Sequence, residues 1–104
     1  MSESSKLEQN LIVKKIDSTT INMQITNNQM LMSIVGEFNQ NLKELEKLTN
    51  TNIFFRGNSI TCKGKERNLQ NFSEALKFLV GKYLLTNIIE KSDIVLSVKK
   101  KYEI

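Results

Sequence analysis

The sequence predicts one α+β domain, in which helices cover one face of a three-stranded antiparallel sheet. Apolar and polar residues alternate at 21–25 and along both arms of a glycine turn at 53–62, as they do in half-buried strands. Three other segments, 30–35, 42–48 and 69–83, carry apolar residues at helical spacing. With 104 residues, the chain has the length of a single domain. The predicted order is therefore β-α-α-β-β-α, followed by a C-terminal helix.

The N-terminal part of the chain gives a weaker signal than the rest. Residues 1–10 are polar and aperiodic, and we expect them to be disordered. The segment LIVKKI at 11–16 has two interpretations, an extra edge strand or a weakly ordered lead-in. The first strand predicted firmly is INMQI, in which Ile21, Met23 and Ile25 alternate with polar neighbours.

Two short helices follow, separated by a glycine. Asn27 or Asn28 supplies the N-cap of the first helix, and Gly36 ends it as a glycine C-cap does. The second helix begins near Asn39 and places leucines at 42, 45 and 48 on one face. We expect Phe38 to pack onto this helix as a hydrophobic staple.

The second half of the sequence predicts a hairpin and two further helices. In NIFFRGNSITCKG the turn falls at residues 56–59, because glycine and asparagine tolerate the backbone of tight hairpins. A long helix begins near Glu66, and a final helix follows a break at 86–91, with Ser92 or Asp93 as its cap. The apolar face of the long helix consists of Leu69, Phe72, Leu76, Leu79, Val80 and Tyr83.

Composition argues against catalysis by this chain. Histidine is absent, which removes most zinc sites and the usual acid–base group near neutral pH. None of the four glycines begins a phosphate-binding GxxxxGK[ST] loop. The single cysteine, Cys62, is expected to be a buried thiol in a cytoplasmic protein. No apolar run is long enough to cross a bilayer, so we expect no membrane partner, and we expect no metal or cofactor in this chain.

The order of elements, with a glycine turn between the first two helices, resembles that of a type I KH domain. The stretch NNQMLMSIVGEFNQNLKELEKLTNTNIFFRGNSITCKG is similar to the N-terminal KH-like region of PhoH-family proteins. The shared features are an asparagine-led helix ending in glycine, an acidic and asparagine-bearing turn, a leucine/glutamate helix, an RGN hairpin turn and a strand ending in KG. They lie at Asn28, Gly36, Asn39–Asn41, Leu42–Glu46, Arg56–Asn58 and Lys63–Gly64.

The later segment IIEKSDIVLSVKK resembles the helix that leads toward the ATPase domain of this family, so the resemblance covers roughly residues 11–100. It divides the chain into a disordered segment at 1–10, a KH-like domain at 11–86, and a C-terminal helix with the start of a linker at 87–104. It implies a bacterial, cytoplasmic parent protein with a P-loop ATPase domain, associated with phosphate starvation and RNA metabolism. ATP and magnesium would be bound by that domain, outside this sequence.

The partners implied by the resemblance are RNA, the chain's own ATPase domain, further copies of the full-length protein and an endoribonuclease of ribosomal RNA maturation. Alignment on the helix after a KH turn places Gly36, Glu37, Phe38 and Asn39 on the four GxxG positions. In such a turn the backbone approaches phosphate. Glu37 opposes an anion and Asn39 adds bulk, so a tight inter-helix turn with Asn39 as N-cap is favoured over a phosphate clamp.

The other candidate residues are basic or aromatic. Lys63, Lys65 and Arg67 follow the last strand and either form a patch with Arg56 or belong to a solvated rim. Phe54 should point away from its two apolar neighbours, either as a platform for base stacking or as part of an interface. Lys43 on the second helix completes the set of candidate residues.

The charge balance permits a nucleic-acid partner without requiring one. The net charge is +4, but without the lysines at 99–101 it is +1. We therefore expect a non-catalytic nucleic-acid-binding module that positions RNA for the ATPase. The alternative is a protein-interaction or oligomerisation module of the same ATPase.

Overall fold

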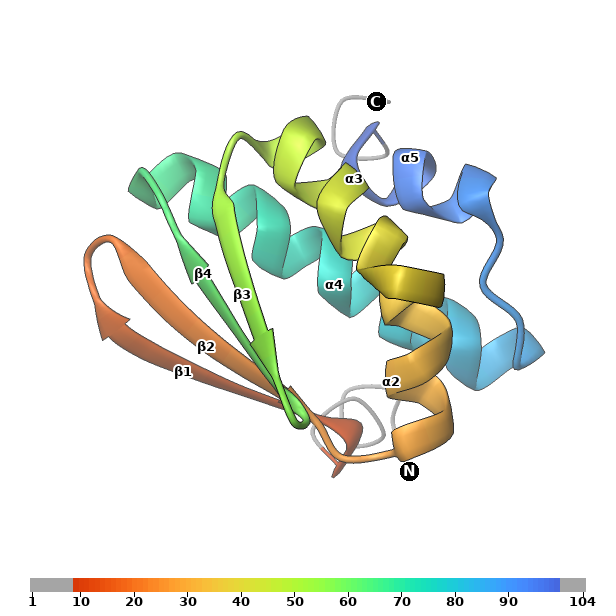
Figure 1. The fold of residues 1–104 in the computed structure, drawn as a ribbon. Coiled ribbons are helices and arrows are strands. Elements are labelled where there is room, and N and C mark those ends of the chain that lie inside the picture. Colours follow the sequence, from red (N-terminus) through yellow and green to blue (C-terminus); the bar gives the residue numbers. More distant parts are fainter. Residues whose placement is uncertain (1–8, 100–104) are drawn as a thin grey trace.

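The computed structural model describes residues 9–99. Residues 1–8 of the predicted disordered segment 1–10 and most of the predicted basic linker lie outside these residues. At Gln9 and Asn10 the prediction of disorder is wrong, because both have helical backbone and their carbonyls accept hydrogen bonds from Thr26. Within residues 9–99 the α+β class is confirmed (Figure 1). The elements in chain order are β1 (Leu11–Asp17), β2 (Thr20–Ile25), α2 (Asn28–Val35), the 3-10 turn η1 (Glu37–Asn39), α3 (Gln40–Thr49), β3 (Asn52–Arg56), β4 (Ser59–Lys63), α4 (Glu66–Thr86) and α5 (Lys91–Lys99).

The sheet has four antiparallel strands in the order β1-β2-β4-β3, so the prediction of three strands is wrong. β1 pairs with β2 from Leu11↔Ile25 to Asp17↔Thr20, which decides between the two interpretations of this segment. A register shift between Lys15 and Asp17 and the lysine side chains on this strand are devices that keep an edge strand from pairing further. From β2 onward, the order of elements is β-α-α-β-β-α, as expected.

All the described helices lie on one side of the sheet, and no described element covers its other face, here called the open face (Figure 1). The helix α4 runs along the covered face, while α5 packs against α3 and α4 at the end remote from the sheet. No helix within residues 9–99 combines the length and the apolar content needed to cross a membrane.

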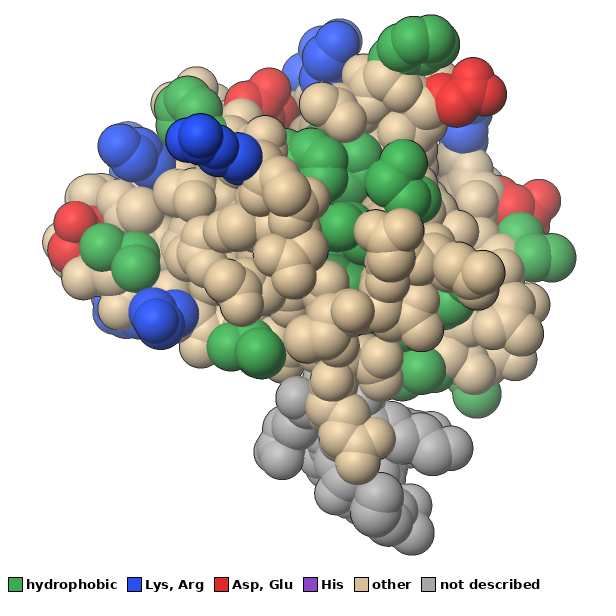
Figure 2. All heavy atoms as spheres, turned by 60° about the horizontal axis from the view of Figure 1, so that its bottom comes forward, with side chains coloured by type: hydrophobic (Ala, Val, Ile, Leu, Met, Phe, Trp, Pro, Cys, Tyr) green, Lys and Arg blue, Asp and Glu red, His purple; other side chains and the backbone are tan. Residues whose placement is uncertain are grey.

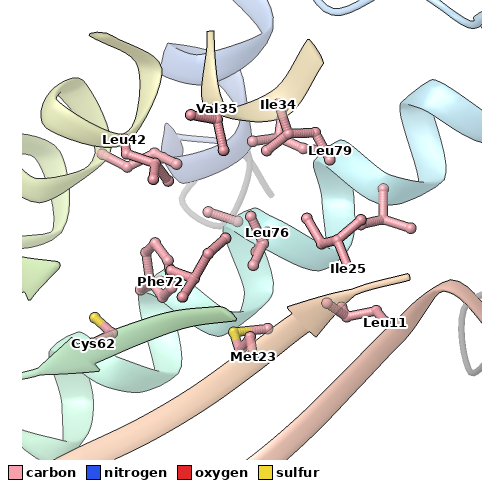
Figure 3. Packing of buried hydrophobic residues seen from close by; sticks show 14 of the residues in the cluster. Leu11, Met23, Ile25, Ile34, Val35, Leu42, Cys62, Phe72, Leu76 and Leu79 are labelled. Carbon is pink, nitrogen blue, oxygen red and sulfur yellow. The ribbon is translucent and has the colours of Figure 1, made fainter. Parts of the chain in front are cut away.

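The core lies between the sheet and α4. Figure 3 shows Met23 and Cys62 of the sheet facing Phe72 and Leu76 of the helix, and all four side chains are fully buried. This confirms the predicted apolar face of the long helix. Burial also raises the pKa of the Cys62 thiol to about 11, so the thiol stays protonated and unreactive at neutral pH.

Both ends of α2 follow the sequence signals, whereas the start of α5 does not. Asn27 caps α2, because its side-chain oxygen accepts a hydrogen bond from the Met30 N–H at 3.0 Å. Gly36 ends that helix with φ of 80°. At α5, however, neither of the two predicted caps is used, because Asp93 lies inside the first turn.

Asp93 fastens α5 to α4. Its buried carboxylate accepts hydrogen bonds from the Lys82 ammonium at 2.8 Å and from the Glu90 N–H at 2.8 Å. The hydrogen bond from the Glu90 N–H is half of a capping box, in which the side chain three residues into the helix bonds back to the N–H before its first residue. The Lys82 hydrogen bond, followed by that from the Glu90 N–H, lowers the pKa of Asp93 below its ordinary value of 3.8. A charged carboxylate therefore joins two helices that are separated by a short loop.

Candidate nucleic-acid interface

The turn between α2 and α3 has an unusual backbone. Gly36, Phe38 and Asn39 all have positive φ, at 80°, 53° and 60°. Glycine and asparagine tolerate this region, whereas phenylalanine is an outlier there. The predicted tolerance of Asn39 for a left-handed backbone is confirmed. Asn39 also occupies the N-cap position of α3, but its side chain makes no capping hydrogen bond.

Hydrogen bonds within the turn use groups that a phosphate would need. The Asn39 N–H donates to the Gly36 carbonyl at 3.1 Å, and the Gln40 N–H donates to the Glu37 carbonyl. The Asn41 amide donates to the Ser33 carbonyl at 3.4 Å, reaching across Gly36. A Cβ at Gly36 would lie 2.6 Å from the Asn41 amide nitrogen. The turn is therefore a closed structural bend, with the Glu37 carboxylate exposed on it.

Phe38 does not act as a staple, so that prediction is wrong. Its side chain is 87% exposed, more than any other large apolar side chain within the described residues. The left-handed backbone at residues 38 and 39 turns the ring outward. The buried apolar side chains of α3 are its own Leu42 and Leu45.

Replacing Phe38 by asparagine is expected to raise the free energy of unfolding by about 1 kcal/mol, because the left-handed strain is relieved and no buried surface is lost. Urea unfolding measures the change. Met32→Asn is a matched control, since Met32 is also exposed but lies in a regular helix. There asparagine is expected to cost about 0.5 kcal/mol. Destabilisation by Phe38→Asn would show that the ring has a structural role.

The open face of the sheet, unlike the turn, carries an aromatic side chain in line with polar and basic ones. On β3, Phe54 is 55% exposed, while its neighbours Ile53 and Phe55 pack against the core, as predicted. Register places Phe54 opposite Thr61, Thr61 opposite Asn22, and Asn22 opposite Lys14. One row thus crosses all four strands over about 14 Å, three strand spacings.

Polar side chains in the middle of this row are held in place. The Asn22 amide donates to the Ser59 hydroxyl at 2.6 Å and to the Thr61 hydroxyl at 3.0 Å. Beside them, the Lys63 ammonium lies 5.7 Å from the centroid of the Phe54 ring, within the range of a cation–π contact. The row therefore combines an aromatic surface, fixed hydrogen-bonding groups and positive charge.

The open face has little negative charge. Asp17, at one corner, is the only acidic residue in the four strands. The Thr19 N–H at 2.9 Å and the Thr19 hydroxyl at 3.1 Å bond its carboxylate and lower its pKa. In Figure 2, basic side chains are spread around the left-hand part of the molecule, where the sheet lies.

The structure separates the predicted basic patch into distinct places. Arg56 and Lys63 occupy opposite ends of the β3–β4 hairpin, about 13 Å apart along the strands. Both lie on the open face. Lys65 precedes α4, and Arg67 lines a groove between this helix and β1. Lys43 lies on α3, beside α5. The candidate residues therefore lie on separate surfaces: the turn, the open face, the start of α4 and, for Lys43, the side of α3 next to α5.

Four contributors to the open face were not among the sequence candidates: Lys14, Asn22, Ser59 and Thr61. Lys14 was missed because the strand that carries it was ambiguous. Asn22 was missed because an amide between apolar residues carries no charge or ring that marks it as a site residue. Strict alternation at 20–25 was the signal that could have identified Asn22, since it assigns every polar residue there to one face.

Comparisons with known proteins do not assign the chain to a group. No family model matches it, and no curated protein matches it.

Proposed function

We propose that this chain is a non-catalytic module that binds single-stranded nucleic acid, RNA in the first place, on the open face of its sheet. The observation that carries the proposal is the exposed Phe54 ring, with Lys63 beside it and Arg56 on the same face. The ring lies in line with polar side chains that hydrogen bonds hold in place. The resemblance to PhoH-family proteins extends the proposal. The module would be KH-like and would position RNA, in the cytoplasm, for a P-loop ATPase domain in RNA metabolism or ribosomal RNA maturation.

The chemistry of the open face suits bases and phosphates together. A base can stack on an exposed aromatic ring whatever its sequence. Asn22 and Thr61 offer hydrogen-bonding groups next to that ring, and Lys14, Arg56 and Lys63 surround it with charge that attracts phosphates. The turn is less suitable, because Glu37 repels phosphate and two of its N–H groups are already bonded.

Binding is expected to be weak and sensitive to salt, because the cationic side chains of the described residues on the open face are three, Lys14, Arg56 and Lys63. For three neutralised phosphates on a single strand, the affinity should fall roughly 20-fold between about 50 and 200 mM salt. Fluorescence anisotropy with a labelled oligouridylate measures this slope. A duplex of matched length is the control, since its bases are stacked and cannot reach Phe54. Absence of binding at low salt, or equal binding of the duplex, would overturn the proposal.

A second candidate function, protein interaction or self-assembly within the parent ATPase, is favoured by Phe38. A strained and almost fully exposed aromatic side chain is costly for an isolated domain and is the kind of outlier that occurs at contact sites. Sedimentation velocity over a range of concentrations tests this alternative. Self-association that is lost in Phe38→Asn, together with no RNA binding, would favour it over the nucleic-acid proposal.

A further inference from the structure

A groove of about 420 Å³ separates α3 from α5, away from the open face of the sheet. Three lysines line it, Lys43 and Lys47 on α3 and Lys91 on α5. None of these three has a hydrogen bond or an ion pair with another residue of the described part of the chain, in contrast to Lys15 and Lys82. The groove is thus bordered by positive charges that form no ion pair within the described residues.

The other residues that line the groove indicate what kind of ligand would suit these lysines. Ile94 is fully buried in the core, so the half-buried Val95 supplies the apolar surface that α5 presents to the groove. Gln40 and Asn41 add side-chain amides at the start of α3. Glu44 is the one carboxylate among the lining residues. The N-terminal halves of both helices border the groove, so their dipoles add to the positive potential of the lysines.

We propose that this groove binds an organic phosphate of nucleotide size. The lysine ammonium groups would contact the phosphates, and a flat ring would cover Val95. The volume lies within the range of pockets for small ligands. The ligand is either a free nucleotide or the phosphorylated end of a nucleic-acid strand, since both present a phosphate next to a ring. This site is independent of the open face, because no residue is common to the two.

Nuclear magnetic resonance titration of the whole chain tests the proposal with ATP, tripolyphosphate and a 5′-phosphorylated oligonucleotide, all without magnesium. Saturable shifts are expected at 40–47 and 91–95. ATP should bind several-fold more tightly than tripolyphosphate, because only ATP covers the apolar surface. In the Phe54→Ala variant, in which the open face is weakened, tighter binding of the oligonucleotide than of ATP at the groove amides would identify a strand end as the ligand, and the reverse would identify a free nucleotide. Equal affinity for ATP and tripolyphosphate, or no shifts in the groove, would overturn the proposal.

Charge variants provide the second test. Replacing Lys43, Lys47 and Lys91 together by glutamine should weaken ATP binding at least about tenfold. The same replacement at Lys65, Lys77 and Lys99 changes the net charge equally and should leave affinity within about twofold. Glu44→Gln should tighten binding a few-fold, a gain that partial unfolding cannot imitate. Phe54→Ala should leave ATP binding unchanged, so failure of this proposal is distinguishable from failure of the proposed function.

Discussion

Replacing Phe54 by alanine is expected to weaken the binding of a single-stranded oligoribonucleotide by about tenfold, because each base stacked on an aromatic ring contributes about 1–3 kcal/mol. Stability should change little, since the ring is more than half exposed and lies outside the core. The dependence of affinity on salt should also remain, because no cation is removed. Anisotropy titrations at several salt concentrations measure both quantities.

Two further variants show whether the loss is specific to the ring. Lys63→Gln should reduce affinity and also lower the salt slope by about 0.7, the value for one phosphate contact on a single strand. Phe38→Asn changes an even more exposed aromatic residue, on the turn, and should leave RNA affinity unchanged. If Phe38→Asn abolishes binding and Phe54→Ala does not, the site is on the turn and the proposed interface is wrong.

Replacing Asp93 by alanine is expected to lower the free energy of unfolding by about 2 kcal/mol, less than for a fully buried ion pair because Lys82 is partly exposed. The variant removes the ion pair to α4 and the hydrogen bond to the Glu90 N–H at the start of α5. Glu66→Gln is the matched control. It breaks the Lys15–Glu66 pair, at a similar 3.0 Å but on exposed side chains, and should cost under about 0.5 kcal/mol.

The effect of Asp93 should depend on pH. Because the folded-state pKa is lowered, the carboxylate stabilises the fold at pH values above 3.8, and this contribution is lost as pH falls through the folded-state pKa. The difference in unfolding free energy between the wild type and Asp93→Ala should therefore shrink on acidification. Urea unfolding across this range measures it. A difference that is constant with pH would show that the charge of Asp93 is not what joins α5 to α4.

The fold was predictable where side-chain spacing alone determines burial. Phe72 and Leu76 lie four residues apart on a helix, and Ile60 and Cys62 lie two apart on a strand, so sequence spacing assigns each pair to one face. β1 was ambiguous because an edge strand buries little, and only Leu11 in it is buried. Pairing with β2 orders this strand, and pairing is a long-range interaction that local periodicity does not encode.

The candidate site was predictable in part, for a related reason. Alternation correctly directed Phe54 to the open face, but the neighbours across the strands depend on register. Lys14 and Asn22 became site residues only when pairing placed them in line with Phe54. For Phe38, the expectation that an apolar residue before a helix packs onto it was overridden by the left-handed backbone of the turn. Local rules fail there because the conformation of the turn is set by the two helices it joins.

Backbone chemical-shift mapping with a short single-stranded oligoribonucleotide that lacks a 5′-phosphate tests binding at the open face, since it reports the contact surface without any substitution. Saturable shifts are expected for amides in β2, β3 and β4, centred on Phe54, Thr61 and Asn22, with residues 36–43 little affected. Shifts confined to 36–43, with the sheet unchanged, would contradict binding at the open face.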